Sequence, residues 1–265
     1  MKTDSILDKI CAQKFEELES EKRTIGFGEL YSMAMDSPAR APFTAALKRN
    51  ADGTPAVIAE LKKASPSAGL IRADFRPGEL AKSLAGAGAA ALSVLTEKNF
   101  FMGSAENLKI AADAVSIPIL RKDFIFDKYQ ICQAKVWGAS AVLLIAAMLS
   151  RAEFEELFGF AESLGLDALC EAHTEDEISM LASAGAKIIG VNCRNLKNFE
   201  TDFERVGTLI KLVPQECVKV SESAIGSRET LLRAGEYGAD AALIGSELMR
   251  ASSPADRLSQ LLGKK

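Results

Sequence analysis

The sequence predicts an α/β protein folded as a closed (β/α)8 TIM barrel with an N-terminal helical extension. Three observations lead to this prediction. After residue 50 the chain carries eight short apolar runs, their starts lie about 26 residues apart, and helical patterning fills the segments between them. That spacing is too long for hairpins and fits a strand, a loop and a crossover helix.

The eight predicted strands are continuous apolar runs rather than alternating ones. Such runs are typical of parallel strands that are buried on both faces. Eight units with no obvious sheet edge favour a closed barrel over the alternative, a doubly wound open sheet. The predicted strands are Ala56–Leu61, Ala90–Leu95, Ile117–Arg121, Ala141–Ala146, Asp167–Cys170, Lys187–Val191, Cys217–Ser221 and Asp240–Ile244.

Helix ends can be recognised between these strands. Capping boxes, in which two side chains satisfy backbone N–H groups at a helix start, are expected at Ser150–Glu153, Thr174–Glu177 and Thr201–Glu204. Helix ends at which glycine allows a left-handed C-cap are expected at Gly138, Gly165, Gly185 and Gly238.

The first 50 residues do not follow the repeat. Apolar side chains share one face of a predicted helix there, at Ile6, Leu7, Ile10, Phe15 and Leu18. We expect this amphipathic helix to dock on the barrel, with Pro38 and Pro42 at the turn into it. The predicted organisation is a single domain of residues 1–265, made of a helical extension (residues 1–50) and a barrel (residues 51–265).

Composition and charge exclude several classes of protein. Hydrophobic residues make up 48% of the 265 residues and charged residues 26%, which is ordinary for a globular protein and argues against disorder. A net charge of −4 provides no basic field for nucleic acid or an anionic membrane. The longest apolar run, Ala141–Leu149, is much shorter than the roughly 20 residues that cross a bilayer.

Cysteine and histidine usage gives no sign of a metal centre. The five cysteines are odd in number and form no CxxC pair, and the chain has one histidine. Unpaired cysteines and the absence of an apolar signal core predict a cytoplasmic location. No Walker A or GxGxxG element indicates a nucleotide, so we expect neither metal nor cofactor.

Charged and polar residues follow several predicted strands at the end where barrel active sites lie. Glu60 and Lys62 close the first strand, on one face by strand parity. Lys122 closes the third strand, and the remaining polar strand ends are Glu171 with His173, Asn192 and Glu222. For one strand alone, a solvated rim or a structural ion pair explains such charges. Together they predict an acid–base site, because a partly desolvated mouth shifts pKa values.

Two loops predict a phosphate site. Ser223-Ala224-Ile225-Gly226-Ser227 follows the seventh strand, and Gly245-Ser246-Glu247 follows the eighth and opens a helix. Small residues let backbone N–H groups approach a phosphate, and these two loops are the recurring phosphate position in this architecture. Taken alone, Gly245-Ser246 is equally explained as a helix N-cap.

The order of these fragments resembles one family closely, the indole-3-glycerol-phosphate synthases of tryptophan biosynthesis. The resemblance covers essentially the whole chain. Its most specific stretch is Glu60-Leu-Lys-Lys-Ala-Ser-Pro-Ser67, and further matches are Leu120-Arg-Lys-Asp-Phe124, Gly190-Val-Asn192, Ser221-Glu-Ser223 and Ile244-Gly-Ser246.

The resemblance implies a carboxy-lyase that closes an indole ring. The substrate would be 1-(2-carboxyphenylamino)-1-deoxyribulose 5-phosphate, converted with loss of carbon dioxide and water. Lys122 would protonate the ketose carbonyl and Lys62 would contact the substrate carboxylate. Glu171 would move the ring proton, with Glu60 and Asn192 assisting at the leaving hydroxyl. The division of acid–base work between the two lysines stays open.

The resemblance also implies a substrate-binding set. Ser65, Ser223, Gly245 and Ser246 would hold the phosphate, and Phe124 and Leu143 would line the aromatic pocket. The full predicted set is Ser65, Phe124, Leu143, Arg194, Glu222, Ser223, Ala224, Gly245 and Ser246.

Two positions depart from the family pattern. Cys193 stands where asparagine is usual, and we interpret it as a packing residue. Ala224 replaces a glycine of the phosphate loop, which would cost free energy if that position needs a positive φ.

Other functions remain as alternatives. The chain could be another phosphosugar-binding barrel, either an isomerase or a Schiff-base lyase that uses Lys122 or Lys62. A non-catalytic barrel scaffold is the alternative of a different class, although such a protein should have lost part of the charged set. We expect a phosphorylated small molecule as the ligand and a monomer in solution.

Overall fold

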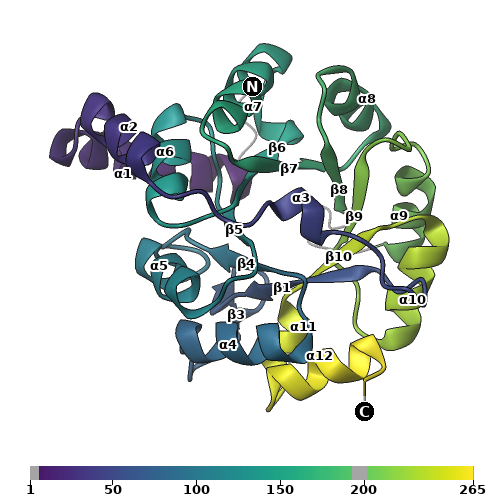
Figure 1. Ribbon diagram of the computed structural model, residues 1–265. Coiled ribbons are helices and arrows are strands. Elements are labelled where there is room, and N and C mark those ends of the chain that lie inside the picture. The colour runs from purple at the N-terminus through teal and green to yellow at the C-terminus, as the bar shows by residue number, and fades with distance from the viewer. Residues whose placement is uncertain (1–5, 193–201, 265) are drawn as a thin grey trace.

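The computed structural model describes residues 6–192 and 202–264. Eight parallel strands close into a barrel in the order β1-β10-β9-β8-β7-β6-β5-β4, with helices outside the ring (Figure 1). The predicted fold class is therefore confirmed. The barrel strands are β1 (Ala56–Leu61), β4 (Ala91–Leu95), β5 (Ile119–Lys122), β6 (Ala141–Ile145), β7 (Asp167–Ala172), β8 (Ile188–Asn192), β9 (Val218–Glu222) and β10 (Ala241–Ile244).

The predicted strand bounds agree with the observed ones to within two residues. The strands extend further at their carboxyl ends than the apolar runs did, because β5, β7, β8 and β9 continue into polar residues of the site. Polar side chains such as Glu171 and Glu222 therefore lie in the sheet itself and are buried.

Helices connect the strands and form the outer layer. The first of them, α4, has Pro77 at its first position, where the missing N–H costs nothing. The outer elements are α4 (Pro77–Ala87), α5 (Ala105–Ala114), α6 (Lys128–Val136), η1 (Ala146–Met148), α7 (Arg151–Ser163), α8 (Glu175–Ser183), α9 (Phe203–Ile210), α10 (Arg228–Tyr237), α11 (Ser246–Arg250) and α12 (Pro254–Leu262). Within the described ranges, no helix combines the length and apolar character needed to cross a membrane.

The predicted helix starts are only partly confirmed. Ser150 and Glu153 form a complete capping box on α7. Thr174 caps α8, but the Glu177 carboxylate accepts a hydrogen bond from the backbone N–H of His173, at 2.6 Å. Thr201 lies outside the described residues, and the N-cap of α9 is Asp202.

Two further capping boxes were not predicted. Asp127 with Gln130 starts α6, and Ser227 with Thr230 starts α10. The predicted glycine C-caps are confirmed as left-handed. Gly238, with φ at +114°, shows the conformation that other residues adopt only at a cost.

A short helix closes the barrel at the amino-terminal ends of its strands. In Figure 1 helix α3 (Phe43–Ala46) lies across the centre of the strand ring, and Phe43 is completely buried. Phe43 and Leu47 belong to the same apolar cluster as the inward residues Ile58 and Leu169. The helix start is fixed by the backbone N–H of Thr44, which donates to the Asp167 carboxylate.

The loop after β1 carries a small hairpin, formed by β2 (Ala64–Ser65) and β3 (Gly69–Leu70). Arg72 holds this loop against α11, which follows the neighbouring strand β10. Its guanidinium donates to the backbone carbonyls of Met249 and Ala251, at 3.2 and 2.9 Å.

The N-terminal extension docks on the barrel through α1 (Ile6–Thr24) and α2 (Phe27–Asp36). The predicted docking is confirmed, but one predicted residue is wrong. Phe15 is 57% exposed, whereas Lys14 is buried between Ile10 and Leu18. Residues four apart share a helix face, so Ile10, Lys14 and Leu18 form the docking stripe.

Lys14 is buried because the barrel offers it a carboxylate. Its ammonium lies 3.2 Å from Asp123, which also contacts Arg121 at 3.0 Å and accepts a 2.6 Å hydrogen bond from Thr96. Burial raises the pKa of the Asp123 carboxyl, but Arg121 and Lys14 outweigh it and the pKa is lowered. Asp123 is thus a buried carboxylate shared between the extension and the barrel.

We predict that Lys14→Ala lowers the free energy of unfolding by about 2 kcal/mol, because it leaves part of a buried charge uncompensated. Phe15→Ala, one position along, should cost less than about 1 kcal/mol, since most of its surface is already in water. Urea denaturation measures both. A larger loss for Phe15→Ala would mean that the helix docks through the face predicted from the sequence.

Candidate active site

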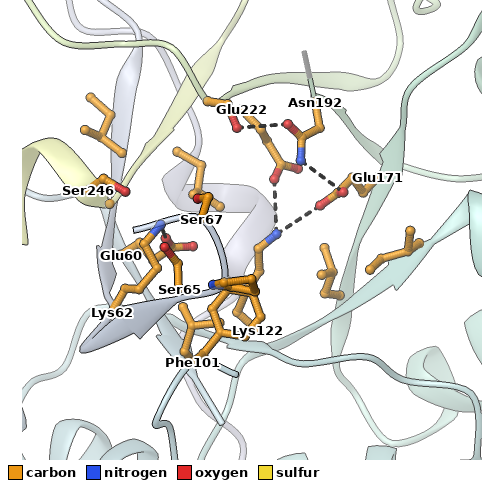
Figure 2. A pocket seen from close by; sticks show the side chains of 18 of the residues that line it. Glu60, Lys62, Ser65, Ser67, Phe101, Lys122, Glu171, Asn192, Glu222 and Ser246 are labelled. Carbon is orange, nitrogen blue, oxygen red and sulfur yellow. Dashed lines mark hydrogen bonds and ion pairs between the residues drawn. The ribbon is translucent and has the colours of Figure 1, made fainter. Parts of the chain in front are cut away.

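A cavity of about 200 Å³ opens at the carboxyl ends of the barrel strands. Figure 2 shows its side chains converging from different strands. The cavity contains all the predicted catalytic residues: Glu60, Lys62, Lys122, Glu171 and Asn192. It also contains eight of the predicted binding residues: Ser65, Phe124, Leu143, Glu222, Ser223, Ala224, Gly245 and Ser246. Arg194 and Cys193 lie outside the described residues.

Lys122 forms the centre of the charged cluster. Its ammonium lies 2.9 Å from a Glu171 oxygen and 3.3 Å from a Glu222 oxygen (Figure 2). Burial opposes the ammonium, but Glu171, Glu222 and Glu60 outweigh it and raise the pKa of Lys122 far above its ordinary value. Lys122 is therefore held as a cation within this cluster.

A hydrogen-bonded chain fixes the orientation of Glu171. The Ser223 hydroxyl donates to the Asn192 carbonyl oxygen at 2.9 Å, and the Asn192 amide donates to Glu171 at 3.1 Å. Strands β7, β8 and β9 thus hold one carboxylate through two polar neighbours. The structure brings Ser223, predicted for phosphate binding, into contact with Asn192, which was predicted to be catalytic.

The two carboxyl groups near Lys122 differ in protonation. Burial raises the pKa of Glu171, but Lys122, His173 and Asn192 outweigh it and lower the pKa to about 2. Burial also raises the pKa of Glu222, Lys122 lowers it, and the neighbouring Glu171 raises it again, giving about 8. Near neutral pH the cluster therefore contains one carboxylate, one carboxylic acid and one ammonium.

A second ion pair completes the charged groups. The Lys62 Nζ and Glu60 Oε1 atoms lie 2.6 Å apart, on one face of the strand as parity predicted. In Figure 2 this pair lies apart from Lys122 and its partners. Gly245 sits directly against Glu60, and a Cβ atom at that position would collide with the carboxylate. This close approach explains glycine at the first position after β10.

Apolar side chains form the opposite wall. Phe101 and Phe124 lie with ring centroids 6.1 Å apart, beside Leu143. Ile6 and Leu7 of α1 also reach the cavity. Sequence reasoning placed these two on the docking face but not in the site, because nothing in a helical pattern says which part of the barrel the helix covers.

The two predicted phosphate loops meet at one edge of the cavity. Ser223 and Ala224 both adopt left-handed backbone, with φ at +71° and +58°. A positive φ at Ala224 is the condition under which alanine is strained. Arg257, which sequence reasoning missed, joins the loops: its guanidinium contacts Glu247 at 2.6 Å and donates to the Gly226 carbonyl at 2.7 Å.

Fold and pocket together define a (β/α)8-barrel enzyme suited to acid–base chemistry on a small anionic molecule. Across residues 6–192 and 202–264, no group of three or more His, Cys, Asp or Glu side chains is placed to hold a metal ion.

Comparison with known proteins identifies the family. The family model for indole-3-glycerol phosphate synthase matches residues 7–261. The chain belongs to the indole-3-glycerol phosphate synthase family.

Two relatives illustrate the similarity. The indole-3-glycerol phosphate synthase of Carboxydothermus hydrogenoformans is 45% identical over 267 aligned positions, covering 97% of this chain and 99% of the relative. That of Koribacter versatilis is 50% identical over 221 positions, covering 83% and 85%.

Solved structures show the same fold at low identity. A variant of the tryptophan synthase alpha-subunit from Pyrococcus furiosus matches with a TM-score of 0.62 at 14% identity, covering 82% of this chain and 99% of that chain. Thiamine phosphate pyrophosphorylase from the same organism gives a TM-score of 0.59 at 14% identity, covering 78% and 94%.

We predict that Ala224→Gly raises the free energy of unfolding by about 1 kcal/mol, because glycine adopts a positive φ without strain. Ala182→Gly, within helix α8, should instead lower it by about 1 kcal/mol. Urea denaturation compares the two. If both variants lose stability equally, Ala224 is not strained.

We also predict a pH-dependent effect of Glu222→Gln. Because the pKa of Glu222 is raised in the folded protein, its stabilising contribution is complete below about pH 4.5 and is lost as the pH rises through about 8. Glutamine cannot ionise. Between pH 5 and pH 9 the free energy of unfolding of the variant should therefore rise, relative to that of the wild type, by more than about 1 kcal/mol.

The exposed Glu79 provides a matched control, since Glu79→Gln should give the same difference from the wild type at both pH values. Denaturation series at pH 5, 7 and 9 give these values. A difference between Glu222→Gln and the wild type that does not change with pH would contradict the assignment of the proton to Glu222.

Proposed function

We propose that this chain is an indole-3-glycerol-phosphate synthase that converts 1-(2-carboxyphenylamino)-1-deoxyribulose 5-phosphate to indole-3-glycerol phosphate. Family membership supports the activity, since the family acts on a phosphorylated small molecule. The observation that carries the proposal is the position of Lys122, a partly buried cation between two carboxyl groups in the pocket.

The lining suggests how the substrate lies. The phosphate would sit between the loops after β9 and β10, where Ser223, Gly245 and Ser246 face the cavity. The aromatic ring would pack against Phe124 and Leu143, which offer the apolar surface that it requires. The ring carboxylate would then pair with Lys62, and Ser65 would complete the phosphate site.

Ring closure requires a cation where negative charge develops on the ketose oxygen. Lys122 would stabilise that oxygen and transfer its proton. Its carboxyl neighbours raise its pKa and so hold this proton tightly. A bound substrate that draws Lys122 away from Glu171 or Glu222 would make the ammonium a stronger acid.

Loss of carbon dioxide and of water would use the remaining groups. Decarboxylation is favoured when the carboxylate leaves water for a pocket of this kind. Glu171, ionised and oriented by Asn192, would then take the ring proton. Lys62 and Glu60 would serve the dehydration step at the leaving hydroxyl.

The geometry disfavours the Schiff-base alternative. A Schiff base forms from a neutral amine, whereas Lys122 is held as an ammonium by three carboxyl groups. The non-catalytic scaffold is disfavoured because the charged set is complete in the pocket.

We further propose a single cytoplasmic domain that works as a monomer. Lys14 of the extension contacts Asp123 of the barrel, and Tyr129 of the barrel donates a hydrogen bond to the extension, which supports one folding unit. Cys11, Cys132, Cys170 and Cys217 are free thiols, in keeping with a reducing compartment. Light scattering after size-exclusion chromatography tests the oligomeric state.

The decisive experiment mixes purified protein with the carboxyphenylamino-deoxyribulose phosphate and follows indole fluorescence. We expect turnover in the wild type and a loss of more than about 1,000-fold in Lys122→Ala, which lacks the proton donor. Lys187→Ala, which removes a lysine from an exposed ion pair with Glu162, should keep wild-type activity. An inactive wild type, or an active Lys122→Ala variant, would contradict the proposal.

A further inference from the structure

His173 is the only histidine of the chain, and the reaction sequence above gives it no role. It follows β7 directly and precedes the N-cap of α8. Its side chain is 13% exposed, and both ring nitrogens are out of contact with solvent. From the sequence, His173 was expected either at the rim or behind the catalytic groups, and the structure places its ring beside Glu171.

The imidazole lies between two carboxylates. Its Nε2 atom is 3.4 Å from Glu171, and its Nδ1 atom is 3.7 Å from Glu177 in the first turn of α8. Glu177 is held there because its carboxylate accepts the His173 backbone N–H, at 2.6 Å. The His173 carbonyl accepts a hydrogen bond from Arg205 of α9. The backbone of His173 is thus fixed at both its N–H and its carbonyl group.

The charges around the ring favour a cation. Glu171 on β7 and Glu177 on α8 lie on either side of it, and Glu222 on β9 adds to their effect when it is ionised. Lys122 and Arg205 are engaged with Glu171 and with the His173 carbonyl. Burial lowers the pKa of His173, but its contacts with Glu177 and Glu171 outweigh burial and raise it. Among the described residues neither ring nitrogen makes a hydrogen bond, so the two carboxylates act on the ring through its charge when both nitrogens are protonated.

We propose that His173 is a positioning residue for the reaction, an imidazolium that keeps the Glu171 carboxylate turned toward Asn192 and Lys122. This inference rests on the proposed function of Glu171 as the group that accepts the ring proton. His173 is well placed for the role because Lys122 binds one Glu171 oxygen, Oε2, while His173 and Asn192 face the other, Oε1. Without His173, Oε1 would lose its charged neighbour and keep its hydrogen bond from Asn192.

The first test uses the wild-type protein and needs no substrate. Because the chain has one histidine, its imidazole NMR signals are unambiguous, and we expect them to titrate above the ordinary pKa of about 6.5. Glu177→Gln should lower that pKa by at least half a unit. Glu175→Gln, an exposed acid of the same helix turn, should leave it unchanged. A histidine that titrates at or below 6.5 would overturn the proposal.

The second test compares kcat of the wild type and His173→Gln across pH 6 to 10. Below the histidine pKa we expect His173→Gln to be about tenfold slower, because Glu171 loses a charged group that fixes its orientation, with KM changed less than twofold. As the pH rises through the pKa measured by NMR, the ratio should fall toward one, since the wild-type ring is then neutral too.

The two tests separate the possible failures. A merely structural role would give a rate ratio that does not change with pH, and that result would overturn the proposal. If the wild type turns over no substrate, the proposed function fails, but the NMR titration still decides whether His173 is a cation between the two carboxylates. If His173→Gln does not fold, the titrations of the wild type and Glu177→Gln carry the test.

Discussion

Closure of the barrel is the constraint on which the rest of the structure depends. Once β1 pairs with both β10 and β4, the carboxyl ends of eight parallel strands must meet on one rim. Side chains from β1, β5, β7, β8 and β9, distant in sequence, therefore share one small volume. The charges gathered there are tolerable only because each has an opposite or hydrogen-bonding partner, as Lys122 has in Glu171 and Glu222. The chemistry of the site follows from this enforced crowding.

Much of this architecture was predictable from the sequence, because a buried parallel strand requires a continuous apolar run and each strand needs a crossover helix. Strand parity also placed Glu60 beside Lys62 correctly. The docking face of α1 was harder: hydrophobicity favours Phe15 over Lys14, and only the position of Asp123 in space explains why the lysine is buried. Arg257 was missed for the same reason, since a surface arginine in a late helix carries no local sign of the two loops that it joins.

Several groups of the site are held in states that cost free energy. Glu222 holds a carboxyl group where ionisation is disfavoured, and Ser223 and Ala224 keep a backbone conformation that glycine accommodates better. These costs are local and fall on the residues that face the cavity. The surrounding barrel, with its inward apolar layer and the closed amino-terminal end, supplies the stability that offsets them.

The helix that closes the amino-terminal end of the barrel has a consequence for synthesis on the ribosome. Phe43 leaves the exit tunnel early, yet the apolar cluster that receives it includes Val220 and Leu243, almost 200 residues later. Until those strands emerge, Phe43 of α3 can contact only part of its apolar cluster, and β1 lacks β10, one of its two neighbouring strands. The nascent chain must therefore keep an aromatic side chain and an open strand edge exposed during most of its elongation.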